Sequence, residues 1–257
     1  MGVIKKFLDD FVYPKKEKCF VCGKDLLLSE VSFLCSDCLE ELDYTSNICK
    51  RCGREIEISK KIKALKNEDK RSLKCEFCSN NRDKLYFEKN RSVFVYENLG
   101  RELIFHFKYF NKKELYLPLG ELLSIYFKEY YSKIDFAYII PIPLYKGRKK
   151  ERGYNQAALL AEIVAKNSGL NLAKDLLIRD KKTPPLYDLN RSKREALMNG
   201  VFTLNKGYSE FELKGKNILL IDDIFTTGTT SNEASFVLKK EGKVNKIYVL
   251  TLAAARV

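Results

Sequence analysis

The sequence predicts an α/β protein in which a layered, parallel-sheet domain follows a small metal-binding domain. All eight cysteines lie before residue 80, and beyond residue 90 short apolar runs alternate with helix-like segments. Alternating strand and helix patterns are typical of a parallel sheet covered by helices on both faces. With 257 residues and 45% apolar content, the chain is long enough for one medium domain and one small domain.

The cysteines form four CxxC pairs, and the first and third pairs are each followed by a glycine. The order CxxCG then CxxC occurs twice, which predicts two consecutive ribbons that each bind one structural Zn²⁺ through four thiolates. Gly23 and Gly53 would permit tight turns that direct backbone N–H groups at sulfur. The predicted zinc ligands are Cys19, Cys22, Cys35, Cys38, Cys49, Cys52, Cys75 and Cys78.

Other uses of these cysteines fit the pattern less well. Disulfides between adjacent CxxC partners would be cramped, and a cytoplasmic chain would keep its thiols reduced. A thioredoxin-like redox site explains one CxxC pair but not four. An interleaved arrangement, in which the first pair joins the third and the second joins the fourth, stays open because spacing alone does not exclude it. In either arrangement we expect the metal to supply much of the folding free energy.

We place the domain boundary near residues 84–90, which gives a double zinc ribbon over residues 1–88 and an α/β domain over residues 89–257. The first 13 residues are predicted to form an amphipathic helix, and residues 59–74 a solvated, lysine-rich insertion. No apolar run approaches the length of a membrane span, and Asp9 and Asp10 lie where a signal peptide needs an apolar core. We therefore expect a cytoplasmic protein without membrane insertion.

The elements of the α/β domain follow from apolar runs and from helical spacing. In chain order we predict a strand at 92–96 (SVFVY), a helix at 115–131, a strand at 137–144 (AYIIPIPL) that runs into a proline turn, a helix at 156–166 (QAALLAEIVAK), a strand at 218–221 (ILLI), a helix at 231–240 and a short strand at 247–252. The helix at 115–131 has its apolar residues at helical spacing, as at Leu119, Leu122 and Leu123.

The segment ILLIDDIFTTGTT, residues 218–230, joins a buried strand to two adjacent carboxylates and a threonine-rich turn. Ligands in open α/β sheets bind at the carboxyl ends of the strands, where Asp222 and Asp223 lie. Neighbouring carboxylates accept hydrogen bonds from a vicinal diol, such as the ribose 2′- and 3′-hydroxyls, directly or through a bound cation. N–H groups and hydroxyls at the start of the next helix suit a phosphate. These residues are Thr226, Thr227, Gly228, Thr229 and Thr230.

A Walker-type nucleotide loop is excluded, because this turn lacks the lysine of the GxxxxGK[ST] motif. The chain is nevertheless cationic, with a formal net charge of +13. Residues 146–194 hold 13 Lys/Arg against 5 Asp/Glu, a net of +8, and such a field favours a polyanionic ligand or nucleic acid. Lys146, Arg148 and Arg152 follow the strand at 137–144 and are candidates to hold a pyrophosphate. The alternative is an exposed, solvated turn.

Residues 218–230 resemble the phosphoribosyl pyrophosphate (PRPP) loop of type I phosphoribosyltransferases. The whole chain resembles the ComF family of competence-associated proteins, also called GntX-like. The likeness rests on the cysteine pairs, the run RKKERGYNQ at 148–156, the segment 183–202 that ends in RSKREALMNGVF, and the PRPP loop. It departs from the family pattern at Leu186 and Leu197, where a glutamine and an asparagine are common.

The resemblance implies a type I phosphoribosyltransferase-like parallel sheet flanked by helices, behind an N-terminal double zinc ribbon. It implies Mg²⁺ as the companion of PRPP, and Arg191 and Arg194 on a flap over the site. It also implies a role in natural transformation, with single-stranded DNA as a ligand and the competence helicase and other DNA-uptake proteins as partners.

Three functional hypotheses follow from the sequence. The chain is a DNA-uptake factor that binds a PRPP-like ligand and single-stranded DNA, or a phosphoribosyltransferase that acts on a base or amine, or a regulatory module that senses PRPP. In the enzyme hypothesis Asp222 and Asp223 are the catalytic groups. The single histidine, His106, is expected to be a packed or surface residue rather than a catalyst.

Overall fold

The computed structural model describes residues 18–26, 34–56, 74–81, 84–109, 115–183, 191–208 and 210–256. The chain divides into two compact units, Met1–Leu42 and Asp43–Val257. The predicted domain boundary near residue 88 stays a prediction. The predicted N-terminal helix, and all but the last residue of the predicted insertion at 59–74, lie outside the described residues.

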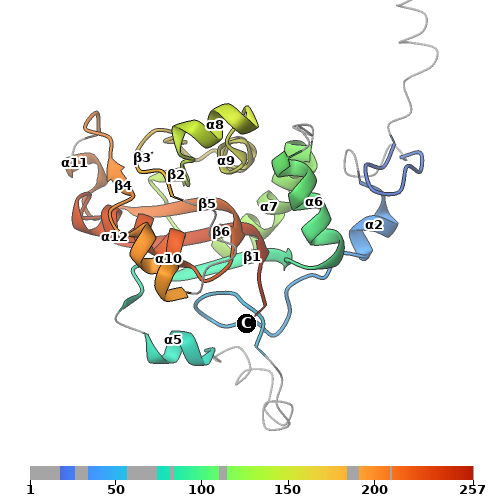
Figure 1. The fold of residues 1–257 in the computed structure, drawn as a ribbon, viewed down its shortest axis with the longest axis horizontal. Coiled ribbons are helices and arrows are strands. Elements are labelled where there is room, and N and C mark those ends of the chain that lie inside the picture. Colours follow the sequence, from blue (N-terminus) through green and yellow to red (C-terminus); the bar gives the residue numbers. More distant parts are fainter. Residues whose placement is uncertain are drawn as a thin grey trace, which may run out of the picture. The chain divides into compact units, whose positions relative to one another are not determined.

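The larger unit is built on a four-stranded sheet in the order β1-β6-β5-β2, with every strand parallel to its neighbour (Figure 1). The strands are β1 (Lys89–Val95), β2 (Tyr138–Pro141), β5 (Asn217–Phe225) and β6 (Lys246–Ala254). In register, Ile218 pairs with Tyr138 on one side and with Ile247 on the other. The predicted parallel sheet is therefore confirmed, and β5 lies in its interior.

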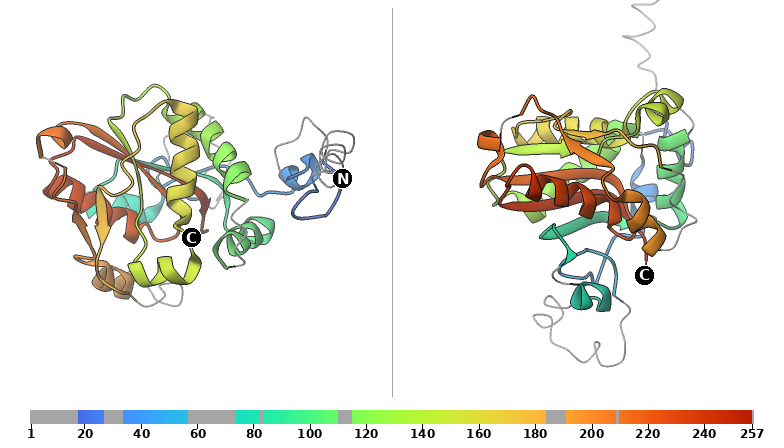
Figure 2. Two further views of the ribbon diagram at one scale, coloured as in Figure 1. Left: turned by 90° about the horizontal axis from the view of Figure 1, so that it is seen from above. Right: turned by 60° about the vertical axis from the view of Figure 1, so that its left-hand side comes forward.

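Helices cover both faces of this sheet. The helices α7 (Tyr116–Tyr131) and α9 (Gln156–Ser168) lie over one face (Figure 2), while α12 (Thr229–Lys240) packs on the other face. A Cβ on Gly120 would lie 2.7 Å from the Cβ of Ile163, so this glycine lets α7 and α9 pack closely. Buried side chains of β5 alternate between the two faces, which explains why its sequence is a continuous apolar run.

A smaller subdomain lies between β2 and β5 in the chain. It contains the antiparallel pair β3 (Leu177–Arg179) and β4 (Phe202–Leu204), with α10 (Arg191–Met198) between them in sequence. The short helix α11 (Glu210–Leu213) leads back to β5.

Two helices were not predicted from the sequence. They are α6 (Asn98–Tyr109), which directly follows β1, and α8 (Lys146–Arg152), which contains the predicted cationic segment. The predicted strand at 137–144 ends at Pro141, because the chain turns there toward α8. The other predicted strands and helices occur, with ends shifted by a few residues.

The second cysteine segment belongs to the larger unit and packs against its sheet. Arg51 donates from Nη2 to the carbonyl oxygens of Leu85 and Phe87, at 2.7 and 3.0 Å. Asn90 on β1 donates to the carbonyl of Cys52 at 2.9 Å. Cys49, Cys52 and Cys78 share one buried cluster with apolar residues of β5, β6 and α12. This cysteine cluster is therefore part of the core on the face of the sheet that α12 covers.

Among the described residues, none of the helices combines the length and the apolar character needed to cross a bilayer.

Candidate functional site

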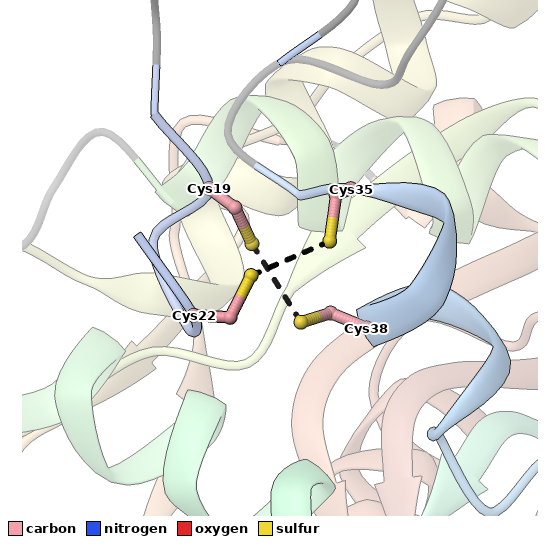
Figure 3. Close-up of side chains that lie close together, drawn as sticks. All are labelled: Cys19, Cys22, Cys35 and Cys38. Atoms are coloured by element: carbon pink, nitrogen blue, oxygen red, sulfur yellow. Dashed lines mark hydrogen bonds between the residues drawn. The ribbon is translucent and has the colours of Figure 1, made fainter. Parts of the chain in front are cut away.

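The eight cysteines gather into two clusters in the order in which they occur along the chain. The first cluster joins Cys19, Cys22, Cys35 and Cys38 (Figure 3), and the second joins Cys49, Cys52, Cys75 and Cys78. Within each cluster all four Sγ atoms lie within 4.8 Å of one another. The sequential pairing is therefore confirmed, and the interleaved alternative is wrong.

The two clusters repeat one local geometry. In each, the glycine after the first pair has a positive φ, +73° at Gly23 and +69° at Gly53, and donates its N–H to the carbonyl of the first cysteine. The second pair spans the start of a short helix, α2 (Ser36–Glu40) in the first cluster and α5 (Glu76–Asn80) in the second. The glycine turn and the helix thus present two thiols each to a common centre.

This geometry fits tetrahedral zinc. Four sulfurs about 2.3 Å from one Zn²⁺ are about 3.8 Å from each other. The observed Sγ–Sγ distances are 3.7 Å for Cys19–Cys38, 3.6 Å for Cys22–Cys35 and 3.7 Å for Cys52–Cys75. Both clusters consist of four thiols and leave no place for a catalytic water, so we assign two structural zinc sites.

The second candidate site lies where β5 ends and α12 begins. Asp222 and Asp223 occupy the carboxyl-terminal half of β5, which runs on to Phe225. Asp223 is 9% exposed, and Asp222 is half-buried and accepts a hydrogen bond from the N–H of Asp223 at 2.9 Å. Two adjacent carboxyl groups are therefore held in a setting with little water.

The turn after these carboxylates leads into α12. Gly228 is the N-cap, with φ of +77°, and a Cβ there would lie 2.6 Å from the ring of Phe225. The hydroxyls of Thr227 and Thr229 are 2.8 Å apart. With Thr226 and Thr230, they place hydroxyls and the N–H groups of the first helical turn side by side, an arrangement that suits an anion.

Lys108 is the cation that contacts this carboxylate pair. It lies in the last turn of α6, and its Nζ is 2.8 Å from Oδ2 of Asp223. Burial raises the pKa of Asp222 to about 7, and the charge of Asp223 adds to this shift, while Lys108 and Arg179 oppose it. The protein therefore compensates the charge of Asp223 more fully than that of Asp222.

Arg179, at the end of β3, is the second cation near the pair. Its side chain is 8% exposed, its Nη2 donates to Oγ1 of Thr183 at 2.6 Å, and its buried Nε has no hydrogen-bond partner among the described residues. Burial lowers the pKa of Arg179 to about 10, and the charge of Arg148 contributes to this shift. Arg148 in turn donates to the carbonyl of Thr183 at 3.3 Å. The guanidinium groups of Arg148 and Arg179 thus lie near each other, and that of Arg179 lies near Asp222.

The remaining predicted site residues are distributed differently. Arg152 faces Tyr109 rather than the carboxylates, with its Nη2 3.2 Å from the tyrosine hydroxyl. Lys146 is exposed at the start of α8. Arg191 and Arg194 lie on α10, and their side chains fall outside the described part of the structure. His106 is half-buried, and its Nε2 lies 3.7 Å from a carboxylate oxygen of Glu102.

Sequence reasoning missed Lys108 and Arg179. Leu99, Leu103, Ile104 and Phe107 recur at helical spacing and are buried, so this period could have revealed α6. Arg179 carried no local signal, because its proximity to Asp222 arises only in the folded chain.

An open hollow of about 330 Å³ adjoins the threonine turn. Its lining comes from α10, the residue that follows it and the first turns of α12, and comprises Glu195, Ala196, Asn199, Thr229, Asn232 and Glu233. Two carboxylates in this wall disfavour a phosphate within the hollow itself. The anion-binding groups at its edge are those of the turn that contains Thr229.

Comparisons with known proteins identify similar sequences for the cysteine segment and for the chain as a whole. The double zinc ribbon domain matches residues 8–79. Competence protein ComFC of Bacillus subtilis is 32% identical over 228 residues, which cover 88% of this chain and 86% of that protein. Competence protein F of Haemophilus influenzae is 28% identical over 93% of this chain and 97% of its own length. DNA utilization protein YhgH of Salmonella typhimurium is 23% identical over 87% of this chain and 91% of its own length.

A solved structure, adenine phosphoribosyltransferase of Saccharomyces cerevisiae, aligns with a TM-score of 0.35 and 16% identity over 56% of this chain and 72% of that one. The protein is of the class that joins a double zinc ribbon to a parallel sheet flanked by helices. The chain belongs to the ComF family.

Proposed function

We propose that this protein acts in DNA uptake in the cytoplasm, and that its larger unit binds PRPP or a closely related sugar phosphate together with single-stranded DNA. The names of its relatives, competence proteins and DNA utilization proteins, support the biological role. The assignment of the ligand rests on one observation at the end of β5. There the adjacent carboxylates of Asp222 and Asp223 are followed in the chain by the N-terminus of α12, which is capped by Gly228.

Each part of PRPP has a chemical counterpart in this site. Asp222 and Asp223 would accept hydrogen bonds from the ribose 2′- and 3′-hydroxyls. The turn at 226–230 would bind the 5′-phosphate through N–H groups and threonine hydroxyls. Arg148 and Arg179 would bind the pyrophosphate, because guanidinium groups pair with phosphate oxygens in a bidentate manner.

The carboxylate pair also fits Mg²⁺. Hard carboxylate oxygens are ligands that this cation prefers, and Mg²⁺ in such sites is shared with substrate phosphates. The pKa of Asp222 is raised to about 7 by burial and by Asp223, which marks a negative charge that the protein leaves poorly compensated. Asp222 and Asp223 would hold the cation, which when bound would neutralise charge on the pyrophosphate.

Calorimetric titrations of the wild-type protein test the ligand assignment. With Mg²⁺ present, we expect PRPP to bind more tightly than either ribose 5-phosphate or pyrophosphate, because only PRPP engages all three groups of residues. Equal affinity for pyrophosphate and PRPP would reduce the site to a general anion site and contradict the proposal. The biological role is tested by deleting the gene and complementing it with wild type or with Asp222→Asn. We expect only wild type to restore the transformation frequency.

A second candidate function is phosphoribosyl transfer to a base or amine, favoured by the position of Asp222 and Asp223 next to each other on β5. Carboxylates beside the ribose would stabilise positive charge that develops on the sugar during transfer. The test is a screen for PRPP-dependent pyrophosphate release across bases, amines and oligonucleotides. Release with a small acceptor supports transfer, whereas PRPP binding without release by any acceptor contradicts it.

A further inference from the structure

We propose that the exposed rings of Phe105 and Tyr109, together with the guanidinium of Arg152, form a stacking platform for the bases of single-stranded nucleic acid. This inference rests on the proposed role in DNA uptake and assigns it a surface. The platform lies on two elements, α6 and α8, and combines planar groups with a strong excess of positive charge.

The three planar groups form a continuous series. The ring centroids of Phe105 and Tyr109 are 5.2 Å apart, with 48° between the ring planes. The guanidinium carbon of Arg152 lies 4.9 Å from the Tyr109 ring centroid, and its Nη2 is 3.2 Å from the tyrosine hydroxyl. These contacts hold the tyrosine ring in place, so a base that stacks there would meet an ordered surface.

Both rings are partly exposed to solvent. Phe105 is 48% exposed and Tyr109 is 55% exposed, although large aromatic side chains are usually well buried. The core face of α6 is formed instead by Leu99, Leu103, Ile104 and Phe107, which are buried. Phe105 and Tyr109 are four residues apart and therefore share a helix face, with the exposed Arg101 one turn before them.

The surrounding charge selects a polyanion as the occupant. The helix α8 contains Lys146, Arg148, Lys149, Lys150 and Arg152 against the single acid Glu151. Lys149 and Lys150 are exposed. A cationic surface beside exposed rings is the arrangement by which proteins bind single strands without sequence preference, since every base has a face that stacks and every linkage has a phosphate.

The rings favour a single strand over a duplex. Bases in a duplex are stacked on each other and present only their edges, whereas bases of a single strand can lie on an aromatic face. The platform also adjoins the carboxylate site through the chain, because Lys108, the neighbour of Tyr109, pairs with Asp223.

The test uses fluorescence anisotropy with two labelled polymers of about 20 units, one an oligothymidylate and the other an abasic deoxyribose-phosphate chain of equal charge. For Phe105→Ala and Tyr109→Ala we expect oligothymidylate affinity to fall about 5- to 150-fold each. Tyr109→Phe keeps the ring and should bind like wild type. On the abasic polymer, all of these variants should match wild type, because only the bases stack.

Two matched variants separate stacking from other effects. Tyr86→Ala removes another partly exposed ring, whose centroid lies 5.0 Å from that of Phe236, and should leave both affinities unchanged. Lys149→Ala with Lys150→Ala should weaken binding of both polymers and lower the salt dependence, with the slope falling by about 0.7 for each phosphate that is no longer neutralised. Thermal unfolding of every variant verifies that the fold is intact.

Three outcomes overturn the inference and are distinct from one another. If the wild-type protein binds neither polymer, the proposed DNA role fails and the platform fails with it. If wild type binds oligothymidylate but folded Phe105→Ala and Tyr109→Ala variants bind it equally well, DNA binding stands and the platform is wrong. An equal drop in affinity for the abasic polymer likewise contradicts stacking.

Discussion

Lys108 and Asp223 form an ion pair of 2.8 Å with little exposure to water, their side chains being 16% and 12% exposed. The pair connects the last turn of α6 with the end of β5. A second acid, Asp222, lies beside it, and no lysine or arginine in the described part of the chain forms an ion pair with that carboxylate. The two carboxylates thus have one lysine beside them, so their negative charge is only partly compensated. This incomplete compensation underlies the predictions about the site.

Removing Lys108 should destabilise the fold. Lys108→Ala leaves Asp223 nearly buried without its counter-ion, which we expect to lower the free energy of unfolding by about 3 kcal/mol. The matched control is Lys174→Ala, since Lys174 pairs with Glu162 at the same distance of 2.8 Å but with side chains 54% and 39% exposed. That change should cost less than about 1 kcal/mol.

Urea unfolding of both variants measures these free energies. Adding Asp223→Asn to Lys108→Ala should recover part of the stability, because the unpaired charge is then removed. Equal costs for Lys108→Ala and Lys174→Ala would contradict the importance of burial in this pair.

The raised pKa of Asp222 predicts a pH-dependent stability. Its folded pKa is about 7 against a usual value of 3.8, so the folded protein binds more protons than the unfolded chain between these values. The free energy of unfolding of the ligand-free protein should therefore fall as pH rises from about 4 to 7 and level off above. Asp222→Asn should remove this fall and stabilise the protein at pH 8 by about 2–4 kcal/mol.

Thermal unfolding midpoints of wild type and Asp222→Asn, measured across this pH range, provide the test. Parallel curves for the two proteins would show that Asp222 is not the group responsible. Because the charged form is needed to hold a cation, PRPP affinity in the presence of Mg²⁺ should rise over the same range, opposite to the stability.

The sequence predicted the parts of the site that lie close together in the chain. Residues 218–230 combine an apolar strand, two acids and a helix start within one segment, and their structure follows from that local order. Likewise, the repeated CxxCG and CxxC pattern was sufficient to predict two clusters. Spacing alone could not choose the sequential pairing, since it depends on which loops close in space.

The contacts that complete the site could not be predicted in this way. Lys108 meets Asp223, and Arg179 approaches Asp222, only because α6 and β3 are folded onto the end of β5. Local periodicity reveals a helix but not the strand against which its last turn lies. The packing of Cys52 beneath β1 is likewise a tertiary contact, made through Asn90.

The two zinc sites should contribute differently to stability. Cys52→Ser removes a ligand that is 1% exposed in the core below the sheet, and we expect the unit Asp43–Val257 to be destabilised by about 3 kcal/mol or more, or roughly 6–12 °C in Tm. Cys22→Ser lies in the other compact unit and should leave this transition unchanged. Elemental analysis should show one zinc fewer in each variant. Equal shifts in Tm would contradict the distinction.

Gly228 should be essential to the turn for two separable reasons. Gly228→Ala places a Cβ 2.6 Å from the Phe225 ring and also forces a non-glycine residue into a left-handed conformation. Gly215→Ala is the matched control, because Gly215 has a similar φ of +73° and no described atom within 4 Å of its Cβ position.

We expect Gly215→Ala to cost about 1 kcal/mol and Gly228→Ala about 1–3 kcal/mol more, with PRPP affinity abolished only in Gly228→Ala. Urea unfolding and calorimetry measure the two effects. If both variants bind PRPP like wild type, the turn at 226–230 is not the phosphate site.

The most direct measurement is calorimetry of PRPP with Mg²⁺ on wild type and on the double variant Asp222→Asn, Asp223→Asn, with zinc content measured in the same samples. We predict that wild type binds and that the double variant, still holding two zinc ions and still folded, shows no detectable heat of binding. An unchanged PRPP affinity in the folded double variant would contradict the assignment of this carboxylate pair as the sugar site.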